Sequence, residues 1–390
     1  MAKKTLNVAL IGGGFMGRAH SNAWIKVGKF FDVDYDIKLK VIVGNSTPIE
    51  AFAERWGYEE TSYDWRSVME RKDIDIVDIV TPTYMHKEMA IAAIKAGKHV
   101  VCEKPFTLSY SDALEMVEAS KNAGVLTYLN HNYRRAPAVT LAKQFVDEGR
   151  LGQIFHWRGA YLQDWIIDPN FPLSWQLKKE YAGGGPLFDL STHALDLARF
   201  IIGEPAAVTA VNKTFVKERP LPGVGATAFT AGTGTDKSKM AQVEIDDASF
   251  AIVEFENGAL GSIETSRFAN GRKNYNDFEI YGSKGSLHFN LERMNELEFL
   301  DATQPGREQG FRRILATEGD HPYESAWWPS GHIVGYEHTF INAFADFLKA
   351  LATDGKITPN FEDGANIIRA ISAIDLSSRE QRRVSIDEIK

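Results

Sequence analysis

The chain has 390 residues, enough for two domains, and its 44% hydrophobic and 25% charged residues are typical of an ordinary globular protein. The formal net charge of −8 argues against binding to the phosphate backbone of a nucleic acid. A single cysteine, Cys102, excludes an internal disulfide and leaves no Cys/His cluster, so no metal site is expected.

The start of the chain predicts a cytoplasmic protein. No apolar run is long enough to span a membrane, and residues 1–4 lead directly into the first predicted strand rather than into a secretory signal. We therefore expect no membrane partner for this chain.

The first half alternates between predicted strands and helices. Apolar runs predict strands at Thr5–Ile11, Leu39–Val43, Ile74–Val80, Lys98–Cys102 and Val125–Asn130. The stretches between them predict helices at Phe15–Val27, Pro48–Trp56, Asp64–Arg71, Tyr84–Ala96 and Ser109–Asn122, with a loop at Phe30–Lys38. This β-α-β alternation predicts a doubly wound parallel sheet.

A glycine motif joins the first predicted strand to the first helix. Gly12, Gly14 and Gly17 have the spacing Gly-x-Gly-x-x-Gly. In this spacing the first glycine makes a tight turn, the second lets backbone approach a pyrophosphate, and the third lets helix and strand pack closely. The helix N-terminus adds N–H groups and a partial positive charge. Residues 1–134 are therefore expected to form a Rossmann domain that binds NAD or NADP.

The second half, residues 135–390, predicts an α+β domain built on one open, mostly antiparallel sheet. Its β-rich segments lie at Ile154–Leu162, Ala207–Val216, Gln242–Glu256, Ala259–Arg267, Asp277–Tyr281, Ser286–Asn290 and Glu296–Leu300. Helices are expected at Leu187–Ile202, His332–Ala352 and Phe361–Ser378, and a loop at Leu221–Lys239.

The segments that follow the strands of the first half should line one crevice, because ligands of doubly wound sheets bind at the carboxyl ends of the strands. The cofactor contacts expected on this rule are Gly12, Gly14, Phe15, Met16, Gly17, Asn45, Ser46, Thr81, Pro82, His86, Glu103 and Lys104.

Lys104 is the first candidate for chemistry. Lysines are usually surface residues, but this one follows a buried strand and precedes Pro105 at the expected crevice. There it can bond a substrate hydroxyl and hold developing negative charge on oxygen. We expect the Lys104–Pro105 peptide bond to be cis, because a sharply turned loop must aim the lysine inward.

Asp189 and His193 lie four residues apart, which places them on one face of the predicted helix. Asp189 could also be a simple helix cap. Together the two predict a base and its orienting carboxylate, since an ordinary histidine can take a hydroxyl proton near neutral pH. Aromatic rings that could pack on a sugar are Trp165, Trp175, Trp327 and Trp328.

The glycine motif, Thr81-Pro82 with His86, Glu103-Lys104-Pro105 and Asp189-x-x-x-His193 occur in this order. The combination resembles the Gfo/Idh/MocA oxidoreductase family over essentially the whole chain. The resemblance implies hydride transfer between a sugar or cyclitol carbon and nicotinamide. It also implies that Lys104, Asp189 and His193 are the catalytic residues, and that the C-terminal sheet forms a homodimer or homotetramer.

Within the family, Tyr161–Trp165 and Asn132–Arg135 are most similar to the pyranoside 3-dehydrogenases, a group that includes enzymes acting on anhydrosugars. This likeness implies oxidation of a ring hydroxyl, at C3, on a glucose-derived pyranose. The substrate contacts it implies are Tyr133, Gln163 and Tyr336. The expected substrate site also includes Lys104, Asp189, His193 and the aromatic candidates Trp165 and Trp175.

The choice of cofactor stays open at the end of the second strand. NAD-preferring folds place an acidic residue there for the ribose 2′-hydroxyl, but this strand ends in Val43, Gly44 and Asn45. No arginine stands next to it, and Asp32, Asp34 and Asp36 are expected to precede the strand. NAD follows from the resemblance, with NADP as the alternative.

The expected mechanism places the pyranose between the cofactor and the second domain. His193 removes the hydroxyl proton, Lys104 polarises the oxygen, and Asp189 holds the sugar and the imidazole. Three alternatives remain: an inositol dehydrogenase, a redox-assisted NAD-dependent glycosidase, and a non-catalytic NAD(P)-binding sensor. The sequence leaves the particular sugar, the physiological direction and the oligomeric state undecided.

Overall fold

A computed structural model of the chain describes residues 3–44, 49–223 and 239–390. The chain divides into two units, and each is described by itself. Unit 1 comprises Met1–Thr107, Ser111–Ala136 and Glu318–Asn366, and unit 2 comprises Leu108–Tyr110, Pro137–Thr317 and Ile367–Lys390. Residues 318–366 thus pack with the N-terminal part of the chain. The functional domain bounds of 1–134 and 135–390 remain a prediction.

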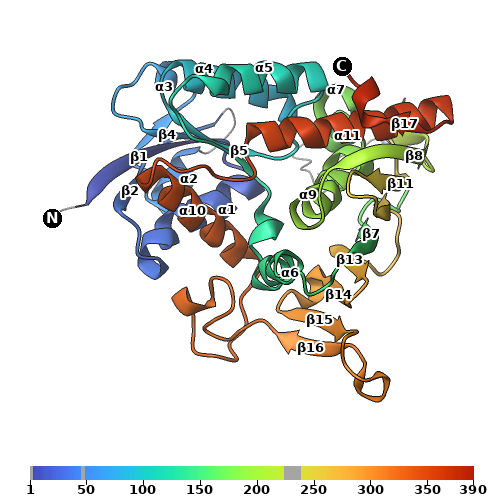
Figure 1. The fold of residues 1–390 in the computed structure, drawn as a ribbon. Coiled ribbons are helices and arrows are strands. Elements are labelled where there is room, and N and C mark those ends of the chain that lie inside the picture. Colours follow the sequence, from blue (N-terminus) through green and yellow to red (C-terminus); the bar gives the residue numbers. More distant parts are fainter. Residues whose placement is uncertain (1–2, 45–48, 224–238) are drawn as a thin grey trace. The chain divides into compact units, whose positions relative to one another are not determined.

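Unit 1 contains the predicted parallel sheet, which has six strands in the order β3-β2-β1-β4-β5-β6 (Figure 1). All neighbouring strands run parallel. The strands are β1 (Lys4–Ile11), β2 (Tyr35–Val43), β3 (Glu60–Ser62), β4 (Ile76–Ile79), β5 (His99–Glu103) and β6 (Thr127–Asn130). Every residue of β4 and β6 is buried, as expected for a sheet that is covered on both faces.

The helices of unit 1 cover this sheet. They are α1 (Phe15–Phe30), α2 (Ile49–Trp56), α3 (Trp65–Met69), α4 (His86–Lys95), α5 (Tyr110–Lys121) and α10 (Tyr336–Ala352), with short turns η1 (Thr83–Met85), η2 (Asn132–Arg135) and η6 (Glu324–Ala326). Helix α10 packs along α1 (Figure 1), where the ring of Phe344 lies 4.1 Å from that of Trp24. A helix near the end of the chain therefore completes the N-terminal fold.

Unit 2 contains a nine-stranded sheet in the order β16-β15-β14-β13-β7-β12-β11-β8-β17. Only β7 and β12 run parallel, and the other pairs in it are antiparallel. Its strands are β7 (Ile154–Leu162), β8 (Pro205–Lys213), β11 (Ala248–Phe255), β12 (Leu260–Ser266), β13 (Tyr275–Gly282), β14 (Gly285–Asn290), β15 (Glu296–Asp301), β16 (Arg312–Leu315) and β17 (Val384–Ser385). A separate pair is formed by β9 (Glu218–Pro220) and β10 (Met240–Gln242).

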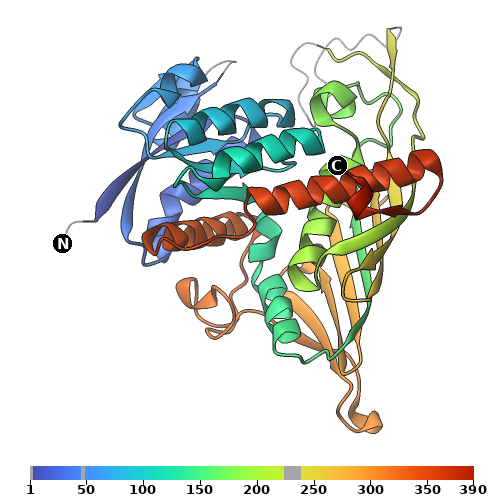
Figure 2. The same ribbon diagram turned by 45° about the horizontal axis from the view of Figure 1, so that its top comes forward.

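Strand alternation divides this large sheet into an inner and an outer face. Trp157, Phe278 and Phe289 point inward and are at most 1% exposed. Two helices, α6 (Pro137–Asp147) and α9 (Ser191–Ile201), pack against the sheet (Figure 2). The remaining helices and turns are α7 (Lys179–Ala182), α8 (Pro186–Asp189), α11 (Phe361–Glu380), η3 (Trp175–Leu177), η4 (Leu291–Arg293), η5 (Gly306–Glu308) and η7 (Ile386–Glu388).

Several predicted elements need correction. Strand β2 begins at Tyr35, so the loop expected at Phe30–Lys38 is wrong, and Asp36 lies inside the strand, at the end remote from its carboxyl end. The strand expected at Gln242–Glu256 is divided into β10 and β11. The helix expected at His332–Ala352 begins only at Tyr336. Most of the loop expected at Leu221–Lys239 lies outside the described residues.

Candidate active site

The glycine turn has the geometry that its spacing predicts. Gly12 has a φ of +118°, a conformation that residues with side chains rarely adopt. A Cβ on Gly17 would lie 2.3 Å from the Gly12 carbonyl oxygen, so the crossing of helix and strand requires a residue without a side chain. A Cβ on Gly14 would meet no atom within 4 Å, so the space beside it is open to a ligand.

Helix α1 begins directly after this open space. Its N-cap is Gly14, no side chain caps it, and its first turn has no acidic residue. These features fit a pyrophosphate, because the N–H groups of the first turn are not claimed by a cap and no carboxylate repels the anion. Two expected cofactor contacts, Asn45 and Ser46, lie outside the described residues.

The Glu-Lys-Pro loop follows β5. The Lys104–Pro105 peptide bond is cis, as predicted. The Lys104 backbone N–H donates to Glu103 Oε2 at 3.2 Å, and Glu103 itself is only 3% exposed. The Glu103 carboxylate contacts His20 and Asn130 in the interior of the unit, and the expected contact of Glu103 with the cofactor stays a prediction.

His86 connects this loop to the turn after β4. Its Nε2 lies 2.9 Å from the Thr81 carbonyl oxygen, and its Nδ1 lies 3.0 Å from that of Pro105. The ring is fully buried, and burial lowers its pKa. His86 therefore lies in contact with two loops of the expected crevice.

Three aromatic residues expected at the site lie near one another in unit 1. The ring of Tyr336, at the start of α10, is 6.2 Å from Phe15 and 6.2 Å from Tyr133. Burial raises the pKa of Tyr336 far above its usual range, so its hydroxyl is protonated. Phe15 is 48% exposed at the first residue of α1. The tertiary fold thus brings residue 336 to the glycine turn.

In unit 2, Asp189 is held by a residue that the sequence analysis missed. Arg267, directly after β12, donates from Nη2 to Asp189 Oδ2, and its guanidinium lies 5.1 Å from the Trp165 ring centre. The Arg267 side chain is 1% exposed, whereas that of Asp189 is 37% exposed. A buried cation therefore positions a partly exposed carboxylate beside an aromatic ring.

The contacts continue from Trp165 to His193. Trp165 Nε1 donates to Gln163 Oε1 at 2.9 Å, and Gln163 Nε2 donates to Asn274 Oδ1 at 3.1 Å. Tyr161 Oη also donates to Asn274 Oδ1, at 2.7 Å, and its ring centre lies 5.7 Å from that of His193. We call Asp189, Arg267, Trp165, Gln163, Asn274, Tyr161 and His193 the polar network. It connects four of the five substrate residues predicted in this unit.

The helix that carries Asp189 differs from the prediction. The single helix expected at Leu187–Ile202 is divided at Leu190 into α8 and α9, so Asp189 ends one helix and His193 lies in the next. Asp246 bonds the backbone N–H groups of Gly185 and Leu187, both at 2.8 Å. Asp189 is therefore not the cap of this helix. A Cβ on Gly185 would lie 1.8 Å from the Asp246 carbonyl oxygen, which explains the glycine.

The other tryptophan candidates are divided between the two units. Trp175 lies in η3 of unit 2 and is 40% exposed. Trp327 packs in unit 1 at 4.5 Å from Phe30 and 4.4 Å from His338, between ring centres. Arg267 and Asn274 had no signal in the sequence, because a lone arginine and a lone asparagine near strand ends follow no motif.

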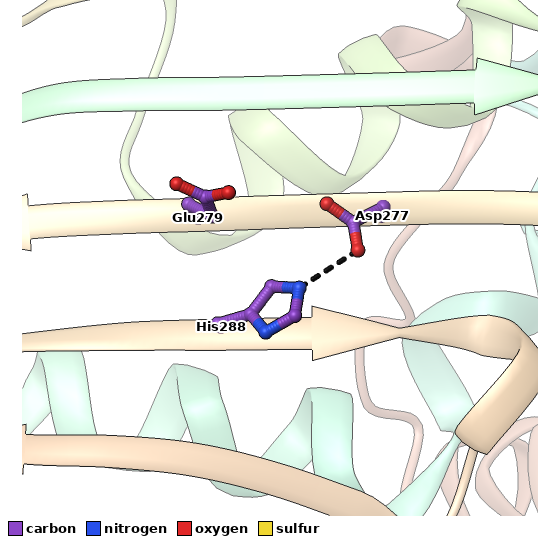
Figure 3. A group of neighbouring side chains, drawn as sticks. All are labelled: Asp277, Glu279 and His288. Atoms are coloured by element: carbon purple, nitrogen blue, oxygen red, sulfur yellow. Dashed lines mark hydrogen bonds and ion pairs between the residues drawn. The ribbon is translucent and has the colours of Figure 1, made fainter. Parts of the chain in front are cut away.

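One group of side chains in the described part of the chain could surround a metal ion. Asp277 and Glu279 on β13 and His288 on β14 place their ligand atoms within 4.8 Å of one another (Figure 3). However, His288 Nε2 is 2.8 Å from Asp277 Oδ2 and Nδ1 is 2.8 Å from Glu298 Oε2. Both nitrogens face carboxylates, so an imidazolium accounts for the group. The expectation that the protein has no metal site remains a prediction.

Within the described residues, no helix has the length and apolar character needed to cross a membrane.

Comparison with known proteins links both halves of the chain to one family. Residues 6–131 match the model described as "Oxidoreductase family, NAD-binding Rossmann fold", and residues 139–288 match the "GFO/IDH/MocA C-terminal domain". Levoglucosan dehydrogenase of Pseudarthrobacter phenanthrenivorans is 42% identical over 99% of both chains. The D-glucoside 3-dehydrogenase of Escherichia coli K12 is 26% identical over 70% of this chain and 73% of its own.

Among solved structures, levoglucosan dehydrogenase in complex with NADH and levoglucosan matches with a TM-score of 0.92 and 41% identity. The match covers 98% of this chain and 100% of that chain. The similarity therefore extends over both the parallel sheet and the nine-stranded sheet.

Proposed function

Since this chain belongs to the Gfo/Idh/MocA family of oxidoreductases, we propose that it oxidises the C3 hydroxyl of a glucose-derived pyranose, with levoglucosan or a related anhydrosugar as its substrate. It is an NAD-dependent sugar dehydrogenase that acts on a CH–OH group. The levoglucosan and glucoside dehydrogenases among its relatives support the choice of substrate. The polar network carries the proposal, because its successive contacts connect a candidate base, a carboxylate and an aromatic side chain.

The chain's own residues have distinct parts in this reaction. The backbone N–H groups at the start of α1 and the space beside Gly14 bind the pyrophosphate of NAD. When bound, the nicotinamide supplies the hydride acceptor. His193 in unit 2 is the base for the sugar hydroxyl, and Lys104 Nζ in unit 1 is a donor to oxygen that gains negative charge. Asp189, held by Arg267, accepts hydrogen bonds from the neighbouring sugar hydroxyls.

A substrate screen tests this proposal. The purified protein is mixed with NAD+ or NADP+ and with levoglucosan, methyl glucoside, myo-inositol or an aryl glucoside, and absorbance of the reduced cofactor is followed at alkaline pH. We expect turnover with levoglucosan and NAD+, and the 3-keto product by NMR. Turnover with inositol alone would make it an inositol dehydrogenase, and release of free sugar without net NADH would make it a redox-assisted glycosidase. Either result overturns the proposal.

We also propose that the outer face of the nine-stranded sheet joins copies of this chain. Four apolar side chains on this face are 48–65% exposed: Val211, Phe250, Ile252 and Leu260. An apolar face of this kind on a sheet is typical of a subunit interface. Light scattering should report a dimer or tetramer for the wild type and monomers for Ile252→Lys, while Ile333→Lys, at an exposed site in unit 1, leaves the assembly intact. A monomeric wild type would contradict this.

A cytoplasmic location completes the proposal. It is supported by the single cysteine, Cys102, which is buried as a free thiol. Fractionation of the native host, with NAD-dependent activity measured in each fraction, tests it.

A further inference from the structure

Three buried charged side chains meet inside unit 1, next to the Glu-Lys-Pro loop. His20 comes from α1, Asp78 from β4 and Glu103 from the end of β5. Their exposed fractions are 0%, 0% and 3%. Because buried charges are costly unless they are paired, an arrangement of three in the core calls for a physical reason.

The distances assign the charge on His20. Its Nδ1 lies 2.9 Å from both carboxylate oxygens of Asp78, and its Nε2 lies 2.9 Å from Glu103 Oε1. Asn130 Nδ2 also lies 3.1 Å from His20 Nε2, but this amide has its shorter contact, 2.6 Å, with Glu103 Oε1. Ionised carboxylates only accept hydrogen bonds, so both ring nitrogens donate to them and His20 is an imidazolium. Trp24 Nε1 donates to Asp78 Oδ2 at 2.7 Å, and Asn130 Nδ2 donates to Glu103 Oε1 at 2.6 Å.

The electrostatics agree with this assignment. Burial alone lowers the pKa of His20, but Asp78 and Glu103 outweigh it and raise that pKa to about 10. Burial alone raises the pKa of Glu103, but His20, Lys104 and Asn130 bring it below its usual value. Glu103 is therefore ionised in the interior.

The ionised Glu103 acts on Lys104 in two ways. Its Oε2 accepts the Lys104 backbone N–H at 3.2 Å, and its charge attracts the lysine ammonium. Asp78, His20, Glu103 and Lys104 then form a neutral row of alternating charges. The rings of Phe340 and Phe344 on α10 lie 5.5 and 5.3 Å from His20 and cover it.

We propose that His20, Asp78 and Glu103 are positioning residues for Lys104: the imidazolium keeps Glu103 ionised, and Glu103 holds Lys104 in place and in its ammonium form for hydride transfer. The proposal rests on the function proposed for Lys104. In this proposal Glu103 acts through Lys104. His20 and Asp78, which no motif in the sequence identified, act through Glu103.

Two variants remove the charge on Glu103 by different routes. Glu103→Gln is isosteric and neutral. His20→Gln removes the cation, so that the buried Glu103 beside Asp78 takes up a proton. We expect each to lower kcat on the order of tenfold or more while the Kd for NADH changes less than about threefold. The double variant should be no worse than either single one, because both act through the same carboxylate.

The pH dependence of kcat distinguishes a positioning role of Glu103 from a purely structural one. Without the Glu103 charge, Lys104 loses its proton more easily, so the alkaline limb of log kcat should move to lower pH by about one unit in both variants. The matched control is Ser21→Ala, the next residue on α1, which loses one buried hydrogen bond to Tyr58 Oη. It should lower the melting temperature and leave the limb unmoved.

The outcomes are distinct. If Lys104→Met abolishes turnover but Glu103→Gln keeps the wild-type rate and limb, the positioning proposal is overturned and the proposed function stands. If Lys104→Met itself turns over normally, the proposed function fails first. If His20→Gln does not fold, the test uses ¹⁵N-histidine spectra of the wild type at pH 8.5. The His288 signal is first identified by its loss in His288→Asn. One further histidine ring must then be doubly protonated at this pH. A neutral His20 at that pH contradicts the proposal.

Discussion

Arg267 and Asp189 form an ion pair across 78 residues of sequence, with the arginine in the core and the carboxylate partly at the surface. The guanidinium also lies over Trp165. This arrangement fixes the direction of a carboxylate that the proposed mechanism needs for sugar hydroxyls.

Breaking this pair should affect sugar binding selectively. Arg267→Met should raise the KM for the sugar about tenfold, roughly 1.4 kcal/mol, since Asp189 loses its fixed orientation. The Kd for NADH, measured by fluorescence, should not change. Arg267→Lys serves as a control that retains the charge without the planar fork and should be intermediate. An unchanged KM in Arg267→Met would show that the pair is only structural.

Removing the proposed catalytic groups should stop chemistry without releasing the cofactor. Lys104→Met and His193→Asn should each lower kcat by about 10²–10⁴-fold, the usual contribution of a positioned acid or base. NADH binding should stay within about threefold of wild type by fluorescence titration. Lys87→Met, which removes surface ion pairs with Asp112 and Glu115, is the matched lysine control. Turnover near wild type in either active-site variant would remove that residue from the mechanism.

The two glycines of the turn should respond differently to alanine. Gly17→Ala places a methyl group 2.3 Å from a backbone oxygen and should destabilise the fold by about 1–3 kcal/mol in urea unfolding. Gly14→Ala meets no protein atom within 4 Å and should cost less than about 0.5 kcal/mol. Its NADH affinity should nevertheless fall at least about tenfold, because the methyl group occupies the ligand's space. Normal NADH binding by Gly14→Ala would show that the pyrophosphate does not bind beside Gly14.

Glu324 should make stability depend on pH. Its side chain is 2% exposed, both carboxylate oxygens lack a hydrogen-bond partner among the described residues, and burial raises its pKa to about 7. The unfolded chain, with the ordinary pKa of 4.5, releases the proton first, so stability falls between pH 4.5 and 7, by up to about 3 kcal/mol.

Glu324→Gln should abolish this loss and be more stable than wild type in urea at pH 8, with little difference at pH 4.5. Glu337→Gln, at a half-exposed position of α10, is the control and should follow the wild-type curve. Parallel curves for wild type and Glu324→Gln would mean that the carboxyl finds a partner in solution.

His288 should show the opposite dependence. Hydrogen bonding to Asp277 is the largest cause that raises its pKa to about 9, despite partial burial. The folded protein therefore holds this proton more tightly, so the stabilisation is complete below pH 6.5 and disappears as pH rises through 9. His288→Gln should cost up to about 3 kcal/mol at pH 6 and almost nothing at pH 10. EDTA should leave the wild-type melting temperature unchanged, and a drop on chelation would instead indicate a bound metal.

Much of the fold followed from local patterns. The apolar run Ile74–Val80 and the Gly12–Gly17 spacing predicted a buried parallel strand and a dinucleotide turn, and both are present. The loop expected at Phe30–Lys38 was wrong because the start of β2 is polar. The first residues of this strand are partly exposed and include charged side chains, so they lack the apolar run that predicts a buried strand. The single helix expected through Leu190 is divided there into α8 and α9, and the start of α8 is held by the Asp246 side chain, 61 residues from Gly185.

The sequence by itself indicated the family, a nicotinamide cofactor and a sugar or cyclitol substrate, with NAD and NADP as alternatives, because the glycine turn, Glu-Lys-Pro and Asp-x-x-x-His are short motifs of neighbouring residues. Only the tertiary structure decided which groups hold them. Arg267 reaches Asp189 across 78 residues and His20 reaches Glu103 across 83. Partners so far apart in the sequence form no local pattern that could predict them. Their charges can be buried only because folding brings each within hydrogen-bond distance of the other.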